Sequence, residues 1–154
     1  MRIVLYEPEI PPNTGNIARL CAATQTPLHL VEPLGFSIED KYLRRAGLDY
    51  WEHVQVRTWP DWAAFLQEKE PGRLVFTSAR KGAAHHLFAF QPDDFLVFGP
   101  ETRGLPEGLL SDDAPCVRVP IWGQVRSLNL STCAGIVLYE ALRRSGVLPA
   151  DLEK

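Results

Sequence analysis

Short apolar runs recur along the chain and alternate with longer amphipathic stretches. The runs have the length of β-strands and are almost continuous, as expected of strands that are covered on both faces. Their alternation with helical stretches predicts an α/β fold with a mainly parallel sheet flanked by helices. The expected strands are Ile3–Tyr6, Leu28–Val31, Leu74–Thr77, Phe95–Phe98 and Val117–Val119, with Val54–Arg57 as a weaker sixth candidate.

Three helices are expected between and after these strands. The first should begin near Asn13 or Thr14, which are good N-cap residues and follow two prolines. The second covers Asp61 to Glu68, and the third runs from about Asn129 to Ser145, with Gly146 just past its end. The residues expected to point inward are Ile17, Leu20, Cys21 and Thr24 of the first helix and Trp62, Phe65 and Leu66 of the second.

The last helix is apolar on two faces. One face carries Leu130, Cys133, Ala134, Val137 and Ala141, and the other carries Ile136, Tyr139 and Leu142. One sheet cannot cover two opposite faces of a helix. We therefore expect a homodimer with this helix in the interface.

Length and composition set the class of protein. A chain of 154 residues that is 45% hydrophobic and 23% charged can bury one core, so we expect a single domain over residues 1–154. The apolar run at the N-terminus is too short for a signal peptide or a membrane span. The three cysteines have no metal-binding or redox spacing and lie in apolar surroundings. We interpret them as reduced residues of a cytoplasmic protein.

The net charge of −3 argues against nucleic-acid binding by bulk electrostatics. Any RNA binding must use local patches of positive charge. Two candidate patches are Lys41, Arg44 and Arg45 at helical spacing, and Arg80, Lys81, His85 and His86 in a glycine-containing loop. Solvated surface charge is an equally good interpretation of each patch taken alone.

Polar clusters follow three of the predicted strands. They read NTGNIAR from Asn13, FGPETRGLP from Phe98, and VPIWGQVRSLNLS from Val119, the last indicating a buried small-molecule site. The first offers a helix start and Arg19, which suit a phosphate. In the second, Gly99 ends a strand and allows close approach of a ligand to the backbone. A plain turn with an internal pair between Glu101 and Arg103 is the alternative for that segment.

Several common sites are excluded by their missing signatures. The chain has no GxxxxGK loop, no GxGxxG fingerprint, no HExxH metal motif and no GxSxG elbow. ATP, NAD, metal ions and a serine hydrolase mechanism are therefore not expected. A backbone-rich pocket for a neutral or cationic small molecule remains, with arginines nearby for an anionic partner. S-adenosylmethionine (AdoMet) fits this description, because its methyl group is already activated.

The three clusters strongly resemble the motifs of the SPOUT methyltransferases. Within that superfamily, LYEPEIPPNTGNIAR, LRRAGLDYW, LVFGPETRGLP and VRSLNLS resemble the small bacterial tRNA (cytidine/uridine-34-2′-O)-methyltransferases. The resemblance covers nearly the whole chain. It implies a C-terminal trefoil knot, which general topology rules treat as a rare exception. It also implies AdoMet-dependent methylation of the ribose of the tRNA wobble nucleotide.

The resemblance further implies roles for individual residues. The implied AdoMet pocket uses Ser78, Gly99, Glu101, Val119, Ile121, Ser127 and Leu128. The implied catalytic residues are Arg19, Asn16 and Tyr139. The implied RNA contacts are Lys41, Arg44, Arg45, Arg103, Arg126 and Asn129, with Lys41, Arg44 and Arg45 meeting the anticodon stem.

Arg19 is a poor general base, because a guanidinium has a pKa above about 12. We expect it to hold a flanking phosphate and to stabilise the developing alkoxide, with the proton passing to that phosphate or to water. Three alternatives stay open from the sequence: a non-catalytic RNA-binding module of the same fold, a 2′-O-methyltransferase acting on another tRNA or rRNA nucleotide, and a nucleotide-binding hydrolase.

Overall fold

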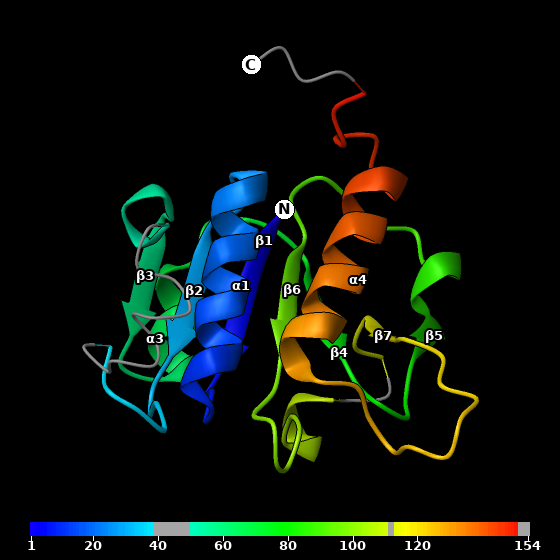
Figure 1. Cartoon of the computed structure of the whole chain (residues 1–154), viewed down its shortest axis with the longest axis horizontal. Helices are drawn as coiled ribbons and strands as arrows, with labels where there is room; N and C mark the ends of the chain where they lie inside the picture. Colours follow the sequence, from blue (N-terminus) through cyan, green and yellow to red (C-terminus); the bar gives the residue numbers. More distant parts are fainter. Residues whose placement is uncertain (39–49, 111–112, 151–154) are drawn as a thin grey trace.

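Seven parallel strands form one sheet in the order β3-β2-β1-β6-β4-β7-β5, as seen in a computed structural model that describes residues 1–38, 50–110 and 113–150 (Figure 1). This confirms the predicted α/β fold with a parallel sheet. The strands are β1 (Arg2–Tyr6), β2 (Leu28–Val31), β3 (Val56–Trp59), β4 (Leu74–Thr77), β5 (Ala83–Ala84), β6 (Phe95–Phe98) and β7 (Cys116–Arg118).

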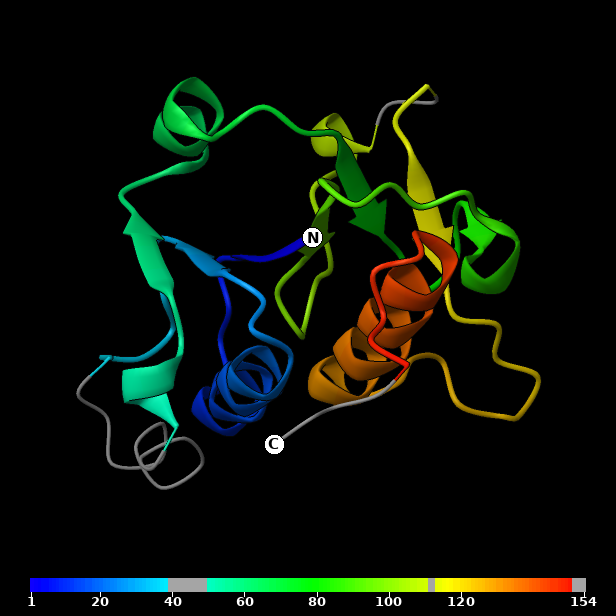
Figure 2. The same ribbon diagram turned by 90° about the horizontal axis from the view of Figure 1, so that it is seen from above.

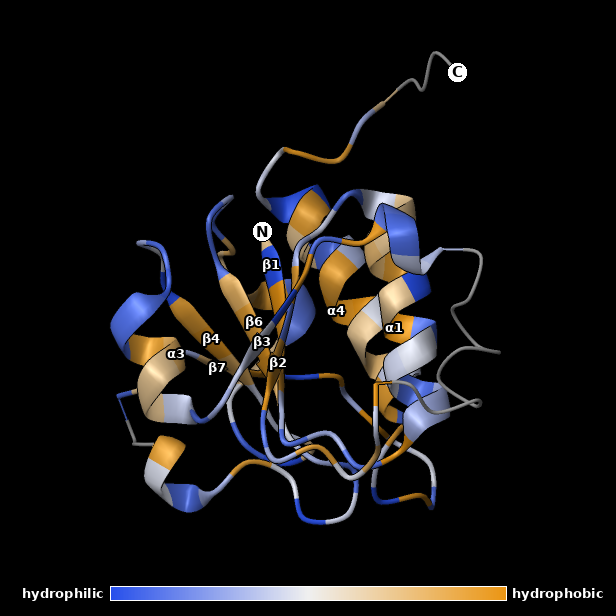
Figure 3. Cartoon of the chain, turned by 90° about the vertical axis from the view of Figure 1, so that its left-hand side faces the viewer, coloured by the Kyte–Doolittle hydropathy of each residue, from blue (hydrophilic) through white to orange (hydrophobic). Residues whose placement is uncertain are grey.

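The apolar runs form strands because both of their faces are buried. Successive side chains of a strand point to opposite faces. In β1, Ile3 and Leu5 enter one core cluster while Val4 enters the other. The two clusters lie on opposite sides of the sheet, and Figure 3 shows the apolar strands between helical layers. This double burial explains why polar residues are rare in the strands.

Two long helices cover one face of the sheet. They are α1 (Pro11–Thr24) and α4 (Leu130–Arg144), which lie side by side in Figures 1 and 2. The shorter α3 (Trp62–Glu68) covers the opposite face, where Phe65 is fully buried (Figure 3). Short 3-10 turns connect other elements: η1 (Trp51–His53), η2 (His85–Leu87) and η3 (Glu107–Leu109). Among the described residues, no helix is long and apolar enough to cross a membrane.

Some predicted boundaries are wrong by one to two residues. The weak sixth strand is present as Val56–Trp59 and not Val54–Arg57. The last strand begins at Cys116 and ends at Arg118, one residue earlier than expected. Strand β5 was not predicted, because two alanines carry no hydrophobic pattern that could mark a strand.

The start of α1 also differs from the prediction. The helix begins at Pro11, after the N-cap residue Ile10, and no side chain of the N-cap makes a capping hydrogen bond. Prolines occupy its first positions, where a missing N–H costs nothing. Asn13 and Thr14 therefore lie inside the helix, and both are buried.

The other helix predictions agree with the structure more closely. Asn129 is the N-cap of α4, and Gly146 has a φ of +73° just beyond its C-cap. Leu66 of α3 was predicted to point inward but is exposed. Leu142 was assigned to the second apolar face of α4 and is instead buried in the core with Val137 and Ala141.

The strand order places late strands between early ones. Strand β6 lies between β1 and β4, and β7 lies between β4 and β5. The loops that leave β1, β6, β4 and β7 consequently meet along the carboxyl edge of the sheet, where ligand sites of parallel sheets form. The trefoil knot remains a prediction from the resemblance.

Candidate active site at the carboxyl edge of the sheet

The Glu101 carboxylate joins the loop after β6 to the start of α1. Oε2 accepts a hydrogen bond from the backbone N–H of Glu9 at 2.8 Å, and Oε1 accepts one from that of Ile10 at 3.1 Å. Oε1 also accepts a hydrogen bond from the side-chain amide of Asn13 at 3.2 Å. The acid therefore holds, from a distant loop, the backbone that leads into α1, whose first two positions are prolines without an N–H group.

Asn13 passes this connection on to α4. Its Oδ1 accepts a hydrogen bond from Nδ2 of Asn129 at 2.9 Å. The Oδ1 atom of Asn129 in turn accepts hydrogen bonds from the backbone N–H of Ser131 at 2.9 Å and of Thr132 at 3.3 Å, which caps α4. One continuous chain of hydrogen bonds thus links the three polar clusters that the sequence analysis singled out. We call Glu101, Asn13 and Asn129 the junction network.

A second set of contacts ties the loop after β1 to the loop after β6. The Thr102 backbone N–H donates to the Glu9 carboxylate at 3.0 Å, and its hydroxyl donates to the same group at 2.8 Å. These bonds lower the pKa of the Glu9 carboxyl. Arg103 forms an ion pair with Glu7, whose φ of +47° is rare for a residue with a side chain. The alternative of an internal pair between Glu101 and Arg103 is therefore wrong, because the acid partner of Arg103 comes from the loop after β1 and Glu101 bonds the backbone before α1.

Arg19 and Asn16 are exposed on the outer side of α1, as predicted. The Arg19 guanidinium carbon lies 4.6 Å from the centre of the Tyr50 ring, within the range of a cation–π contact. The ring holds the guanidinium plane in place without consuming its N–H donors. Within the described ranges, no hydrogen bond or ion pair occupies those donors.

The segment after β7 does not form the buried site that its sequence indicated. Residues 122–127 are exposed, including Arg126 and Ser127, while Val119, Ile121 and Leu128 are half-buried. The apolar character of the following helix arises from packing of α4 against α1 and the sheet and not from a closed ligand cavity. The loop is instead exposed to solvent at the carboxyl edge of the sheet.

The loop after β4 carries Ser78 in an ordered turn. Its hydroxyl oxygen accepts hydrogen bonds from the backbone N–H groups of Arg80 at 3.2 Å and Lys81 at 3.1 Å. Its own N–H donates to the Val117 carbonyl at 3.0 Å, which holds the loop against β7. Both basic side chains are exposed. This part of the second predicted patch is therefore presented to solvent.

Gly99 is needed for a reason that differs from the one expected. A Cβ at this position would lie 2.4 Å from the backbone nitrogen of Leu105. The missing side chain thus allows the loop after β6 to fold back on itself. The fold of this loop alone therefore explains the glycine, without a ligand close to the backbone.

The structure brings most predicted site residues to one edge of the sheet but not all. Ser78, Gly99, Glu101, Val119 and their neighbours follow strands β4, β6 and β7 at that edge. Tyr139 lies in the third turn of α4 on its outer face and is 47% exposed. Lys41, Arg44 and Arg45 lie outside the described residues.

Asn13 is the residue that the sequence analysis missed. It was interpreted as a helix cap, yet it is 5% exposed and is the middle member of the junction network. A buried asparagine is costly unless its amide is paired. Its position in the NTGNIAR cluster was the one sign of a role in the site, but its partners Glu101 and Asn129 are distant in sequence.

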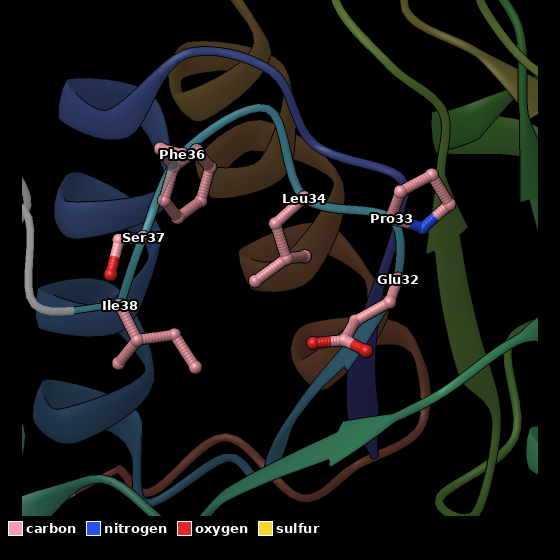
Figure 4. A pocket seen from close by; sticks show the side chains of 6 residues that line it. All are labelled: Glu32, Pro33, Leu34, Phe36, Ser37 and Ile38. Atoms are coloured by element: carbon pink, nitrogen blue, oxygen red, sulfur yellow. The ribbon is translucent and has the colours of Figure 1, made fainter.

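A separate shallow hollow of about 530 Å³ lies in the segment that follows β2 (Figure 4). Its lining comprises Glu32, Pro33, Leu34, Phe36, Ser37 and Ile38. None of the predicted site residues within the described ranges lines it. The segment is fastened to the loop after β1 by a hydrogen bond from the Gly35 N–H to the Pro8 carbonyl at 2.9 Å.

The three cysteines are free thiols, as predicted. Burial raises the pKa of Cys21 to about 12 and that of Cys133 to about 11, so these thiols stay protonated at neutral pH. A protonated thiol is a weak nucleophile. In the described ranges, no three His, Cys, Asp or Glu side chains are grouped as metal ligands would be.

Comparison with known proteins gives consistent matches along the chain. A tRNA (cytidine(34)-2'-O)-methyltransferase of Methylovorus glucosotrophus is 55% identical over 145 residues, which cover 92% of this chain and 94% of that protein. The enzyme of the same name from Escherichia coli is 50% identical over 149 residues, covering 95% and 94%.

A solved structure from work on the 2-OH methylation of C/U34 on tRNA has a TM-score of 0.88 and 48% identity. The superposition covers 93% of this chain and 94% of that one. The model of the SpoU rRNA Methylase family matches residues 1–139. The chain therefore belongs to the SpoU rRNA methylase family, within the SPOUT fold.

Proposed function

We propose that this chain transfers a methyl group from AdoMet to the 2′-hydroxyl of the wobble ribose, nucleotide 34, of tRNA. The proposal is supported by family membership and by relatives at 55% and 50% identity, which carry this activity in their names. It is also supported by their nearly complete coverage of the chain.

The observation that carries the proposal is the junction network. Glu101, Asn13 and Asn129 fasten the loop after β6, the start of α1 and the start of α4 to one another. A methyl transferase must align an acceptor oxygen with the donor carbon to within a fraction of an ångström. A network that is centred on the buried Asn13 and fastens three segments together supplies such fixed geometry.

The residues at the carboxyl edge fit AdoMet by their chemistry. Bound AdoMet would supply an activated methyl group, which needs no acid or metal to leave the sulfonium. The loops after β4, β6 and β7 offer main-chain groups and uncharged side chains for the adenosine. In this proposal the contacts come from Ser78, Gly99, Val119, Ile121, Ser127 and Leu128, while Glu101 positions the loop, since both of its oxygens are already bonded within the protein.

Arg19 would hold the phosphate next to the target ribose. Its guanidinium is permanently charged and lies over the Tyr50 ring. This charge stabilises the alkoxide that develops at the 2′-oxygen. The proton would pass to the phosphate or to water, because no deprotonated guanidinium is available at neutral pH.

The proposed RNA surface surrounds this edge. Arg126 is exposed in the loop after β7, and Arg103 is held by Glu7 beside the loop after β1. Asn129 contributes by fixing the start of α4. The full proposed set contains Asn16, Tyr139, Arg103, Arg126, Asn129, Lys41, Arg44 and Arg45, with the last three directed to the anticodon stem.

We also propose that the functional unit is a homodimer formed through α4. Ile136 and Tyr139 are 36% and 47% exposed on the outer face of that helix. A second copy would cover them and bring two RNA-binding edges into one particle. Three free thiols agree with action in the cytoplasm.

Two measurements test the proposal. Calorimetry should detect binding of AdoMet and not of ATP. Methyl transfer to unmodified tRNA should then separate an enzyme from a non-catalytic RNA-binding module. Binding of ATP in place of AdoMet, or AdoMet binding without transfer to any tRNA, would contradict it.

A further inference from the structure

Trp122 is the most exposed large apolar side chain among the described residues. It is 94% exposed and lies in the loop between β7 and α4, which extends beyond β5 at the right of Figures 1 and 2. The next residue, Gly123, has open space where a Cβ would lie. The indole therefore contributes no packing to the core, and the fold does not explain a tryptophan at this position.

Positive charge lies next to this loop. Arg118 ends β7, four residues before Trp122, and its guanidinium donates to the carbonyl of Gly82. The Lys81 carbonyl lies 3.7 Å from the thiol of Cys116 at the start of the same strand. The Ser78 turn thus lies against β7, the strand that leads into the Trp122 loop. Arg80 and Lys81 project from that turn, and Arg126 lies further along the Trp122 loop.

The charges of Arg80, Lys81 and Arg126 are accessible to an anion, because all three side chains are exposed. The ion pair of Lys81 with Glu107 is 3.9 Å long, and both side chains are largely exposed. Such exposed pairs contribute little to stability, and a phosphate can replace the carboxylate. An exposed aromatic ring next to exposed arginine and lysine is the combination that binds single-stranded nucleic acid, through base stacking and phosphate contacts.

We propose that Trp122 stacks on an unpaired nucleobase of the RNA substrate while Arg80 and Lys81 hold the adjoining phosphates. This inference rests on the proposed function, since it deepens the description of the same RNA-binding edge. A second copy of the chain is the competing occupant, because an exposed indole could also be buried in a dimer. The adjacent basic side chains favour RNA, because phosphates would pair with them, whereas a two-fold contact through this loop would bring the basic side chains of both copies together.

The test measures KM for an unmodified anticodon stem-loop RNA with wild type, Trp122→Ala, Trp122→Phe and the control Leu87→Ala. Leu87 is also exposed but lies in η2, outside this loop. Trp122→Ala should raise KM by about tenfold or more, the effect of one lost stacking contact. Trp122→Phe should restore part of the affinity, and Leu87→Ala should bind as wild type does.

Replacing single loop nucleotides by abasic residues locates the base. One such RNA should weaken binding to wild type but cause no further loss with Trp122→Ala, because both changes remove the same contact. AdoMet affinity and molecular mass should stay unchanged in Trp122→Ala. Unchanged KM, a loss of AdoMet affinity, or dissociation of a dimer in this variant would each overturn the proposal.

The two proposals fail in different ways. If wild type methylates tRNA and Trp122→Ala does so with the same KM, only the stacking contact is refuted. If wild type transfers no methyl group to tRNA, the proposed function is refuted. The abasic series measures RNA binding directly and still decides the stacking contact in that case.

Discussion

At the scale of single residues, the buried Asn13 and the exposed Arg19 have different roles. Asn13 bonds Glu101 and Asn129 and is nearly inaccessible to solvent. Arg19 lies only six positions later, on the outer side of the same helix. The helix therefore presents a structural residue inward and a proposed phosphate ligand outward. Residues of one helix can differ in this way because the helical period places them on different faces.

Arg19→Lys should cripple turnover. Lysine keeps the positive charge but loses the planar fork that binds phosphate through two parallel hydrogen bonds. We expect kcat/KM for tRNA to fall by roughly a hundredfold, the effect of removing one group that stabilises a transition state. Steady-state methyl transfer measures this. Near-normal activity would remove Arg19 from the mechanism.

Asn13→Asp should destabilise the fold. The substitution removes the amide donor and places a second carboxylate beside Glu101. We expect the free energy of unfolding to fall by about 1–3 kcal/mol, measured by denaturant titration. Asn16→Asp is the matched control, because Asn16 is exposed on the same helix. Equal losses in the two variants would show that the junction network does not hold the loops.

At the scale of elements, β2 and β3 are joined by a buried polar contact. The Trp59 indole N–H donates to Nδ1 of His29 at 3.0 Å, within a cluster of aromatic rings. Burial and the nearby charges of Arg2 and Arg57 lower the pKa of His29 to about 4, although Glu70 opposes the shift. Only the neutral imidazole can accept this hydrogen bond.

The contact predicts how stability depends on pH. Because the folded pKa of His29 lies below its unfolded value of 6.5, the stabilisation is complete above pH 6.5 and is lost as the pH falls toward 4. The loss amounts to at most about 3 kcal/mol. Thermal unfolding should show His29→Gln less stable than wild type at pH 7, with the gap closing by pH 4. Parallel profiles would contradict this account.

The sequence predicted elements well where local pattern decides them. Runs such as Phe95–Phe98 are strands because every residue is buried, and Asn129 caps α4 through its own neighbours. The start of α1 was misplaced because prolines take its first two positions and because Glu101, about ninety residues away, holds the backbone just before them. Local propensity contains no information on such a contact. The sequence indicated that the three clusters form a site. It did not indicate that Asn13 is the residue that links them.

At the scale of the whole molecule, one face of α4 is left partly exposed by the residues that the structure describes. The helix packs Ala134, Val137 and Ala141 inward and leaves Ile136 exposed. The prediction of two apolar faces is thus only partly right, since Leu142 belongs to the inner one. A dimer through the outer face would combine two copies of the basic edge.

Ile136→Asp should dissociate that dimer. We expect light scattering to give twice the chain mass of 17.3 kDa for wild type and the mass of one chain for the variant. The reason is that a buried, unpaired carboxylate opposes association. Leu66→Asp is the control, since Leu66 is exposed on α3 at the opposite face of the sheet. A wild type of single mass at micromolar concentration would contradict the proposed dimer.

The account as a whole depends on the carboxyl edge holding a methyl donor against a ribose oxygen. The most direct measurement is transfer of labelled methyl from AdoMet to two tRNAs that differ only by a 2′-deoxyribose at nucleotide 34. We predict label in the ribose tRNA, mapping to the 2′-oxygen of that nucleotide, and none in the deoxyribose tRNA. Equal labelling of both substrates, or label at another nucleotide, would contradict the account.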